Sequence, residues 1–174
     1  MALKILESDP LVDIQDPSGT LNSAGRLVDP VWLAYIDSLL DKYTLNNKLL
    51  LLQTPQFLFE QLNVDIVKNG GFYAYPPASL QCLQRSLGHR NLEIDLMDLN
   101  FLLLKRIIED ASFKCEDWLE IVDQYLADND PCIIGISGLC ISTDVTNPEF
   151  HFTGLLQHLR NLDNHIIIAG GTIA

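Results

Sequence analysis

Residues 132–138 read Cys-Ile-Ile-Gly-Ile-Ser-Gly, and this stretch decides the fold. It is a short apolar run that ends in a turn of small residues, which predicts a strand buried on both faces. Residues 49–52 and 165–169 are similar short apolar runs, whereas residues 92–98 alternate apolar and polar side chains. The sequence therefore predicts four strands, of which the first begins near Lys48.

Helical patterns lie between these strands. Leu80, Leu83 and Leu87 share one face of a helix that Pro77 opens and Gly88 ends. The other predicted helices are residues 101–110, a helix with Trp118, Ile121, Val122 and Tyr125 on its face, and a helix begun by Asn147 and Pro148, with Phe152, Leu155, Leu156 and Leu159 on its face. Alternating strands and helices form a parallel sheet with helices on both sides. We expect a three-layer, Rossmann-like α/β fold of the flavodoxin type, with four strands in the order 2-1-3-4.

The first 47 residues form a separate region in this prediction. Residues 1–29 show no period and are rich in turn-forming residues, which predicts an irregular leader. A helix capped by Asp29 follows from Pro30 to Tyr43, and its apolar stripe should pack on the main domain, on a partner or on a later part of a longer chain. We therefore expect a leader with its helix over residues 1–47 and an α/β domain over residues 48–174.

The composition argues against several classes of partner. The 23 acidic and 11 basic residues give a net charge of −12, and no Lys/Arg cluster is present to neutralise nucleic-acid phosphates. No apolar run approaches the roughly 20 residues that cross a bilayer, and the N-terminus lacks the pattern of a signal peptide. We expect a cytoplasmic protein without nucleic-acid or membrane partners. The cysteines, Cys82, Cys115, Cys132 and Cys140, lack the close spacing of a metal site and are expected to be reduced thiols.

Three strand ends are expected to lie on the same edge of the sheet. They are Thr54-Pro55-Gln56, Ser137-Gly138-Leu139 and Gly170-Gly171-Thr172. Ligands of open parallel sheets bind at this edge, and glycine lets a flat ligand approach the backbone. The alternative interpretation is structural, because any turn between a strand and a helix favours Gly and Ser.

The combination of these turns resembles a known family. Residues 134–139 followed by residues 167–171 are similar to the cobalamin-binding domains of methionine synthase and the mutases, where a Ser-x-Leu turn and a Gly-Gly turn flank the slot for the nucleotide tail. Residues 75–77, 88–89 and 98–100 look like the cobalamin-binding domains attached to radical SAM enzymes, and the resemblance spans residues 48–172. It implies a cobalamin site made of Thr54, Pro55, Gln56, Tyr75, Pro76, Ser137, Gly138, Leu139, Cys140, Gly170, Gly171 and Thr172.

The sequence departs from the wider family at one motif. In methionine synthase and the mutases, D-x-H-x-x-G follows the first strand and its histidine ligates cobalt, but the loop after Leu52 contains no histidine. The radical SAM group commonly lacks this ligand, so the resemblance implies cobalamin without a histidine on its lower face. Such cobalt suits methyl transfer to or from a radical. We interpret all four histidines, His89, His151, His158 and His165, as surface or structural residues.

The resemblance also implies a second half. Radical SAM catalysis needs S-adenosylmethionine and a 4Fe-4S cluster on three closely spaced cysteines, and cysteines separated here by 8 to 33 positions cannot form that motif. We expect a radical SAM domain in the same longer chain, a sheet that lacks its final helix and strand, and no catalysis by this part alone.

Other families fit less well. Residues 135–138 nearly match the G-x-S-x-G motif of α/β-hydrolases, but Leu139 occupies the fifth position. Residues 53–56 have no likeness to the G-x-G-x-x-G of dinucleotide-binding domains, and a P-loop is absent. A flavodoxin-like binding or regulatory module that does not bind cobalamin remains an alternative. A phosphate-accepting receiver would need an Asp where Ser137 ends the third strand.

Overall fold

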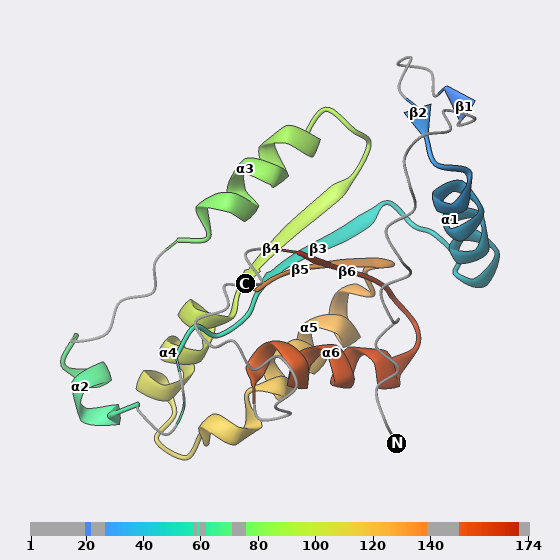
Figure 1. Ribbon diagram of the computed structural model, residues 1–174. Helices are drawn as coiled ribbons and strands as arrows, with labels where there is room; N and C mark the ends of the chain where they lie inside the picture. Colours follow the sequence, from blue (N-terminus) through green and yellow to red (C-terminus); the bar gives the residue numbers. More distant parts are fainter. Residues whose placement is uncertain are drawn as a thin grey trace. The chain divides into compact units, whose positions relative to one another are not determined.

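A computed structural model describes residues 20–21, 27–57, 59, 62–70, 76–138 and 150–170 (Figure 1). The chain divides between Lys42 and Tyr43 into two compact units. No helix within the described ranges is long and apolar enough to cross a membrane.

The first unit holds two short strands and one helix. Strands β1 (Thr20–Leu21) and β2 (Leu27–Val28) pair antiparallel, so the expectation of an entirely irregular leader was wrong. Strands of two residues leave no alternation to read in the sequence. Helix α1 (Pro30–Lys42) follows, and the Asp29 carboxylate accepts a hydrogen bond from the Val31 amide at 2.8 Å, which confirms the cap.

The second unit is built on a parallel sheet of four strands. They are β3 (Lys48–Gln53), β4 (Glu93–Asp98), β5 (Ile133–Ser137) and β6 (Ile166–Gly170). The strand order is β4-β3-β5-β6, which confirms the predicted order 2-1-3-4 and the Rossmann-like α/β class.

The strands end in register at their carboxyl edge. Gln53 pairs with Asp98 on one side and with Ser137 on the other, and Ser137 pairs with Gly170. The last residues of all four strands therefore form one row, and the strand ends that the sequence singled out lie on the same edge, as expected.

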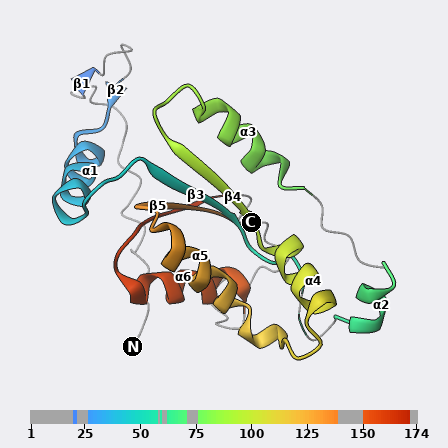
Figure 2. The same cartoon turned by 180° about the vertical axis from the view of Figure 1, so that it is seen from behind.

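The helices cover the two faces unequally. They are α2 (Val64–Lys68), α3 (Ala78–Leu87), α4 (Leu99–Glu109), α5 (Leu119–Asn129) and α6 (His151–Leu162), with a 3-10 turn at Cys115–Asp117. Figures 1 and 2 show α3 on one face of the sheet and α4, α5 and α6 on the other. Among the described helices, α3 packs on β3 and β4 from its own side.

Three helix boundaries differ from the sequence pattern. Helix α2 was not predicted, because a single turn capped by Asn63 is too short to show a period. Helix α4 begins at Leu99, two residues earlier than predicted, because Asp98 caps it through the Asn100 and Phe101 amides. Helix α6 begins at His151, while the proposed starting pair, residues 147–148, lies outside the described residues.

The apolar core lies between the sheet and the three-helix layer. Leu50, Leu52, Ile134 and Ile136 point to this side, where side chains of α4, α5 and α6 bury them. The most deeply buried helix residues are Leu99, Leu103, Val122, Leu155 and Leu159. Burying one such side chain contributes about 1.5–3 kcal/mol, so this layer supplies most of the driving force for folding.

Candidate functional site

A groove opens on the face of the sheet that carries α3. It encloses about 440 Å³ between this helix and strands β3, β5 and β6. Its lining residues are Leu51, Ser79, Leu80, Leu83, Gly135, Ile136, Ser137, Gly138, Ile168 and Gly170. Small-molecule sites usually measure roughly 300–1,000 Å³, so the groove is large enough to hold part of a cofactor.

Two glycines leave the floor of the groove without side chains. An added Cβ at Gly135 would come to 3.0 Å from Cδ2 of Leu51. At Gly170, which ends β6, an added Cβ would meet no described atom within 4 Å. As far as the described residues go, the space beside Gly170 is therefore open, and its backbone is available to a flat group.

The walls of the groove are apolar with two hydroxyl groups. Leu80 and Leu83 of α3 face the bare strands, and the only polar side chains among the described lining residues are Ser79 and Ser137. No described lining residue is charged. The groove suits a ligand part that is largely uncharged where it is enclosed and that carries a few hydrogen-bonding atoms.

Gly138 has a different role from Gly170. A Cβ at Gly138 would lie 2.7 Å from the ring of Phe152 in α6, a distance that real contacts do not reach. The Gly138 amide donates to the Gly170 carbonyl at 3.0 Å and continues the ladder beyond β5. Packing of α6 therefore explains this glycine without a ligand, in line with the structural alternative for turns of this kind.

The turn after β3 forms the next part of the carboxyl edge. The side chains of Thr54 and Pro55 are buried, and Gln56 is half-buried. The Thr54 amide donates to the Ser137 carbonyl at 3.4 Å, so this turn and the end of β5 are joined. A ligand above the strand ends would meet the backbone of the turn and Gln56 more than the first two side chains.

The structure brings part of the predicted site together. Ser137, Gly138 and Gly170 line the groove, whereas Pro76 is exposed just before α3. The remaining predicted residues, Tyr75, Leu139, Cys140, Gly171 and Thr172, lie outside the described residues.

Sequence reasoning missed one wall and the floor of the groove. The sequence predicts Leu80 and Leu83 as part of a helix face and Gly135 as part of a buried strand, and it does not single out Ser79. The available signal was Gly135, because glycine inside a strand often marks a close approach of a ligand or another backbone.

The described histidines have structural surroundings, as expected, and none lines the groove. His89 is exposed, and His158 of α6 pairs with Asp123 of α5 at 2.5 Å. Nδ1 of the buried His165 lies 2.6 Å from the carbonyl oxygen of Pro131, at the end of the sheet opposite the groove mouth. Burial lowers the pKa of His151, and a hydrogen bond to the Pro55 backbone opposes this shift. The described residues contain no cluster of metal-ligating side chains.

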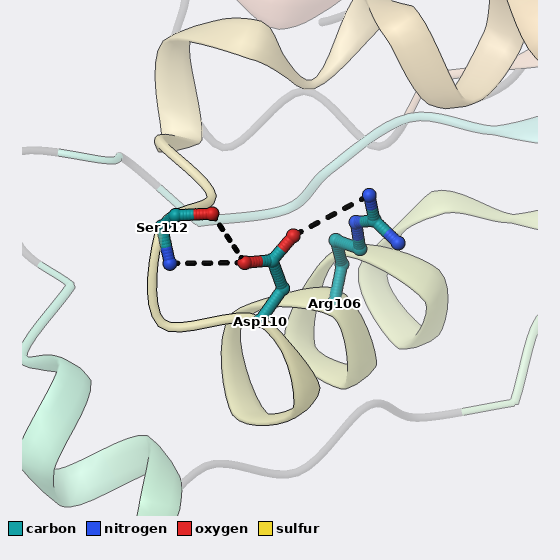
Figure 3. Close-up of polar contacts among 3 residues, drawn as sticks. All are labelled: Arg106, Asp110 and Ser112. Carbon is teal, nitrogen blue, oxygen red and sulfur yellow. Dashed lines mark hydrogen bonds and ion pairs between the residues drawn. The ribbon is translucent and has the colours of Figure 1, made fainter.

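A second hollow, of about 410 Å³, lies between α4 and α5. Its charges are balanced, since Lys105 pairs with Glu109 and Arg106 pairs with Asp110. Figure 3 shows that the Asp110 carboxylate also accepts hydrogen bonds from the amide and hydroxyl of Ser112. These two bonds lower the pKa of Asp110 more than the charge of Arg106 does. These contacts end α4 and shape the next turn, so they have a structural explanation.

The carboxyl edge and the groove are thus the candidate site of the described chain. The groove provides a bare floor, an apolar wall and two hydroxyls, and its mouth reaches the row of strand ends. Comparisons with protein-family models, with curated proteins and with solved structures found no match for this chain.

Proposed function

We propose that this chain binds cobalamin, with the nucleotide tail in the groove beside α3 and the corrin over the strand ends. One observation carries the proposal: the groove has two glycines in its floor, Gly135 beside the Leu51 side chain and Gly170 with no described atom near an added Cβ, and it opens at Ser137. These are strand positions at which the sequence resembles cobalamin-binding domains.

The groove fits the tail by shape and by chemistry. A flat benzimidazole would lie between the backbone of β5 and β6 and the side chains of Leu80 and Leu83. Ser79 and Ser137 would offer hydrogen bonds to the ring nitrogen or ribose. The corrin is too broad for the groove and would remain over the edge formed by Gln53, Ser137 and Gly170.

Cobalamin supplies a cobalt centre for methyl transfer or radical chemistry, and the protein orients it. No described groove residue is a histidine, in keeping with a cofactor that has no imidazole ligand from this chain. The chemistry would belong to a radical SAM domain with its own S-adenosylmethionine and 4Fe-4S cluster. A cytoplasmic location is part of the proposal, and the free thiols of Cys82, Cys115 and Cys132 support a reducing compartment.

The experiment is retention of hydroxocobalamin by the purified protein after desalting, followed by titration. Gly170→Val should weaken binding at least tenfold, because its side chain would occupy the open space above β6. Gly88→Val is the matched control, since Gly88 lies exposed at the other end of α3. Absence of binding by the unaltered protein, or equal affinity of a folded Gly170→Val variant, would refute the proposal.

The alternative is a flavodoxin-like binding or regulatory module for another small molecule. One such module, a phosphate-accepting receiver domain, is disfavoured. A receiver domain needs several carboxylates at the carboxyl edge. Asp98 is the only carboxylate among the last residues of the described strands, and it caps α4. Burial raises the pKa of Asp98, and its Oδ1 already accepts hydrogen bonds from the Asn100 and Phe101 amides. If hydroxocobalamin fails to bind, titration with a flavin nucleotide tests the remaining flavodoxin-like alternative.

A further inference from the structure

The turn Thr54–Gln56 is fixed by contacts from three different elements. Its first amide is bound by the end of β5, through the Ser137 carbonyl. Its other backbone groups are bound by Asn100 of α4 and His151 of α6. Turns at strand ends usually have fewer restraints, so this number of anchors needs a reason.

Asn100 uses both ends of its carboxamide on the turn. Its Oδ1 accepts a hydrogen bond from the Gln56 amide at 2.6 Å, and its Nδ2 donates to the Thr54 carbonyl at 3.4 Å. Only 4% of the residue is exposed. The carboxamide also hydrogen-bonds the Asp98 carboxylate, which caps α4 through the Asn100 and Phe101 amides. Asn100 therefore joins the turn to the start of the helix.

His151 holds the middle of the same turn. Its ring lies against that of Phe59 at a tilt of 43°, with centroids 4.1 Å apart, and packs edge-to-face with Trp118 at 5.6 Å. Proline has no N–H, so the hydrogen bond between the ring and the Pro55 backbone runs from the ring N–H to the carbonyl. The residue is 8% exposed, and burial favours the neutral ring, which has a single N–H to donate.

We infer that Asn100 and His151 are positioning residues that hold the turn Thr54–Gln56 in its ligand-binding shape before a ligand arrives. The turn borders the row of strand ends, so a ligand over this edge would rest on its backbone and on Gln56. A turn that had to become ordered on binding would lose backbone entropy and bind more weakly. The identity of the ligand rests on the proposed function, but the preformed turn does not.

Three variants test the inference. Asn100→Ala removes both carboxamide bonds to the turn, and His151→Phe removes the bond to Pro55 while keeping a ring against Phe59 and Trp118. His151→Gln keeps an N–H donor and should recover part of the effect. Leu155→Ala is the control for stability, because it opens the core without touching the turn.

The first measurement is hydrogen exchange in the ligand-free protein. A peptide over residues 54–56 reports only the Thr54 and Gln56 amides, since Pro55 has none. We expect faster exchange there, by at least tenfold, in Asn100→Ala and to a lesser degree in His151→Phe. Gly170→Val and Leu155→Ala should leave this local exchange unchanged under conditions where the proteins stay folded.

The second measurement is the Kd for hydroxocobalamin. It should rise roughly tenfold in Asn100→Ala and His151→Phe, and less in His151→Gln and Leu155→Ala. Unchanged exchange in folded Asn100→Ala and His151→Phe proteins would overturn the inference, and so would an equal rise of Kd in Leu155→Ala. If the unaltered protein binds no hydroxocobalamin, the proposed function fails, while the exchange experiment still decides whether these side chains preform the turn.

Discussion

The two faces of the sheet differ although the same strands make both. Towards α4, α5 and α6, the strand residues Leu50, Leu52, Ile134 and Ile136 are at most 3% exposed. Towards α3, Ile168 is 58% exposed and Leu83 of the helix itself 44% exposed. Because successive strand residues point to opposite faces, neighbours in the sequence have opposite roles. One face is closed and supplies stability, and the other has exposed apolar side chains and the groove.

The difference is largest in β5 and β6. Ile134 and Ile136 of β5 fill the closed face, whereas Gly135 between them contributes no side chain to the open face and has Leu51 beside it. In β6, Ile167 packs against the core, whereas Ile168 is exposed. A substitution should therefore change stability on one face and binding on the other, even at adjacent positions.

The largest expected effect is on the closed face. Leu155→Ala should lower the free energy of unfolding by about 2–5 kcal/mol, because it leaves a cavity at a fully buried position. Leu83→Ala, on the open face, should lower it by less than about 1 kcal/mol, since this side chain is partly in solvent. Urea denaturation followed by circular dichroism measures both. Equal losses in the two variants would show that the faces do not differ in this way.

The next largest effect on stability is expected from substitutions of two glycines at the carboxyl edge of the sheet. Gly138→Ala should destabilise the protein by about 1–3 kcal/mol, because the new Cβ would overlap the Phe152 ring on the closed side. Gly170→Ala should change stability by no more than about 0.5 kcal/mol, because its Cβ would enter open space. Thermal unfolding of both variants provides the comparison. A destabilised Gly170→Ala protein would mean that the groove is closed in solution.

The strand order was predictable from the sequence, but the choice of face was not. Short apolar runs between helical patterns imply a parallel sheet, and the order 2-1-3-4 is the one expected of the flavodoxin type. However, in residues 49–52 all four side chains are leucine, so no alternation distinguishes Leu51, which lines the groove, from Leu52, which lies in the core. Which face has one helix and which has three follows from packing between distant segments.

The candidate site was predictable only in part, because the sequence shows local signals but not the contacts between distant segments. The turns at Ser137 and Gly170 are local signals, and the parallel register brings them together. Asn100 and His151 give no such signal for the turn Thr54–Gln56, because that turn is distant from both of them in the sequence. Only the structure shows that the first turns of two helices hold this loop.

The smallest effect is a pH dependence on the closed side. His151 is buried there, and desolvation lowers its pKa below the ordinary value of 6.5. As the pH falls through 6.5, the unfolded chain takes up a proton at this residue more readily than the folded chain. The free energy of unfolding should therefore decrease on acidification until the pH passes below the folded pKa.

The variant His151→Phe isolates this contribution. It keeps an aromatic ring against Phe59 and Trp118 but has no proton to bind, so its stability should fall less between neutral and mildly acidic pH. Burial raises the pKa of Asp98 above its ordinary value of 3.8, so the folded chain takes up a proton there at a higher pH than the unfolded chain. The contribution of Asp98 to the free energy of unfolding therefore increases on acidification, which is opposite in sign to that of His151. The Asp98 contribution is common to both proteins and cancels in the difference. Urea titrations of the two proteins across this range give the measurement. Parallel pH profiles would mean that water reaches His151 and that the closed face is less sealed than its leucines indicate.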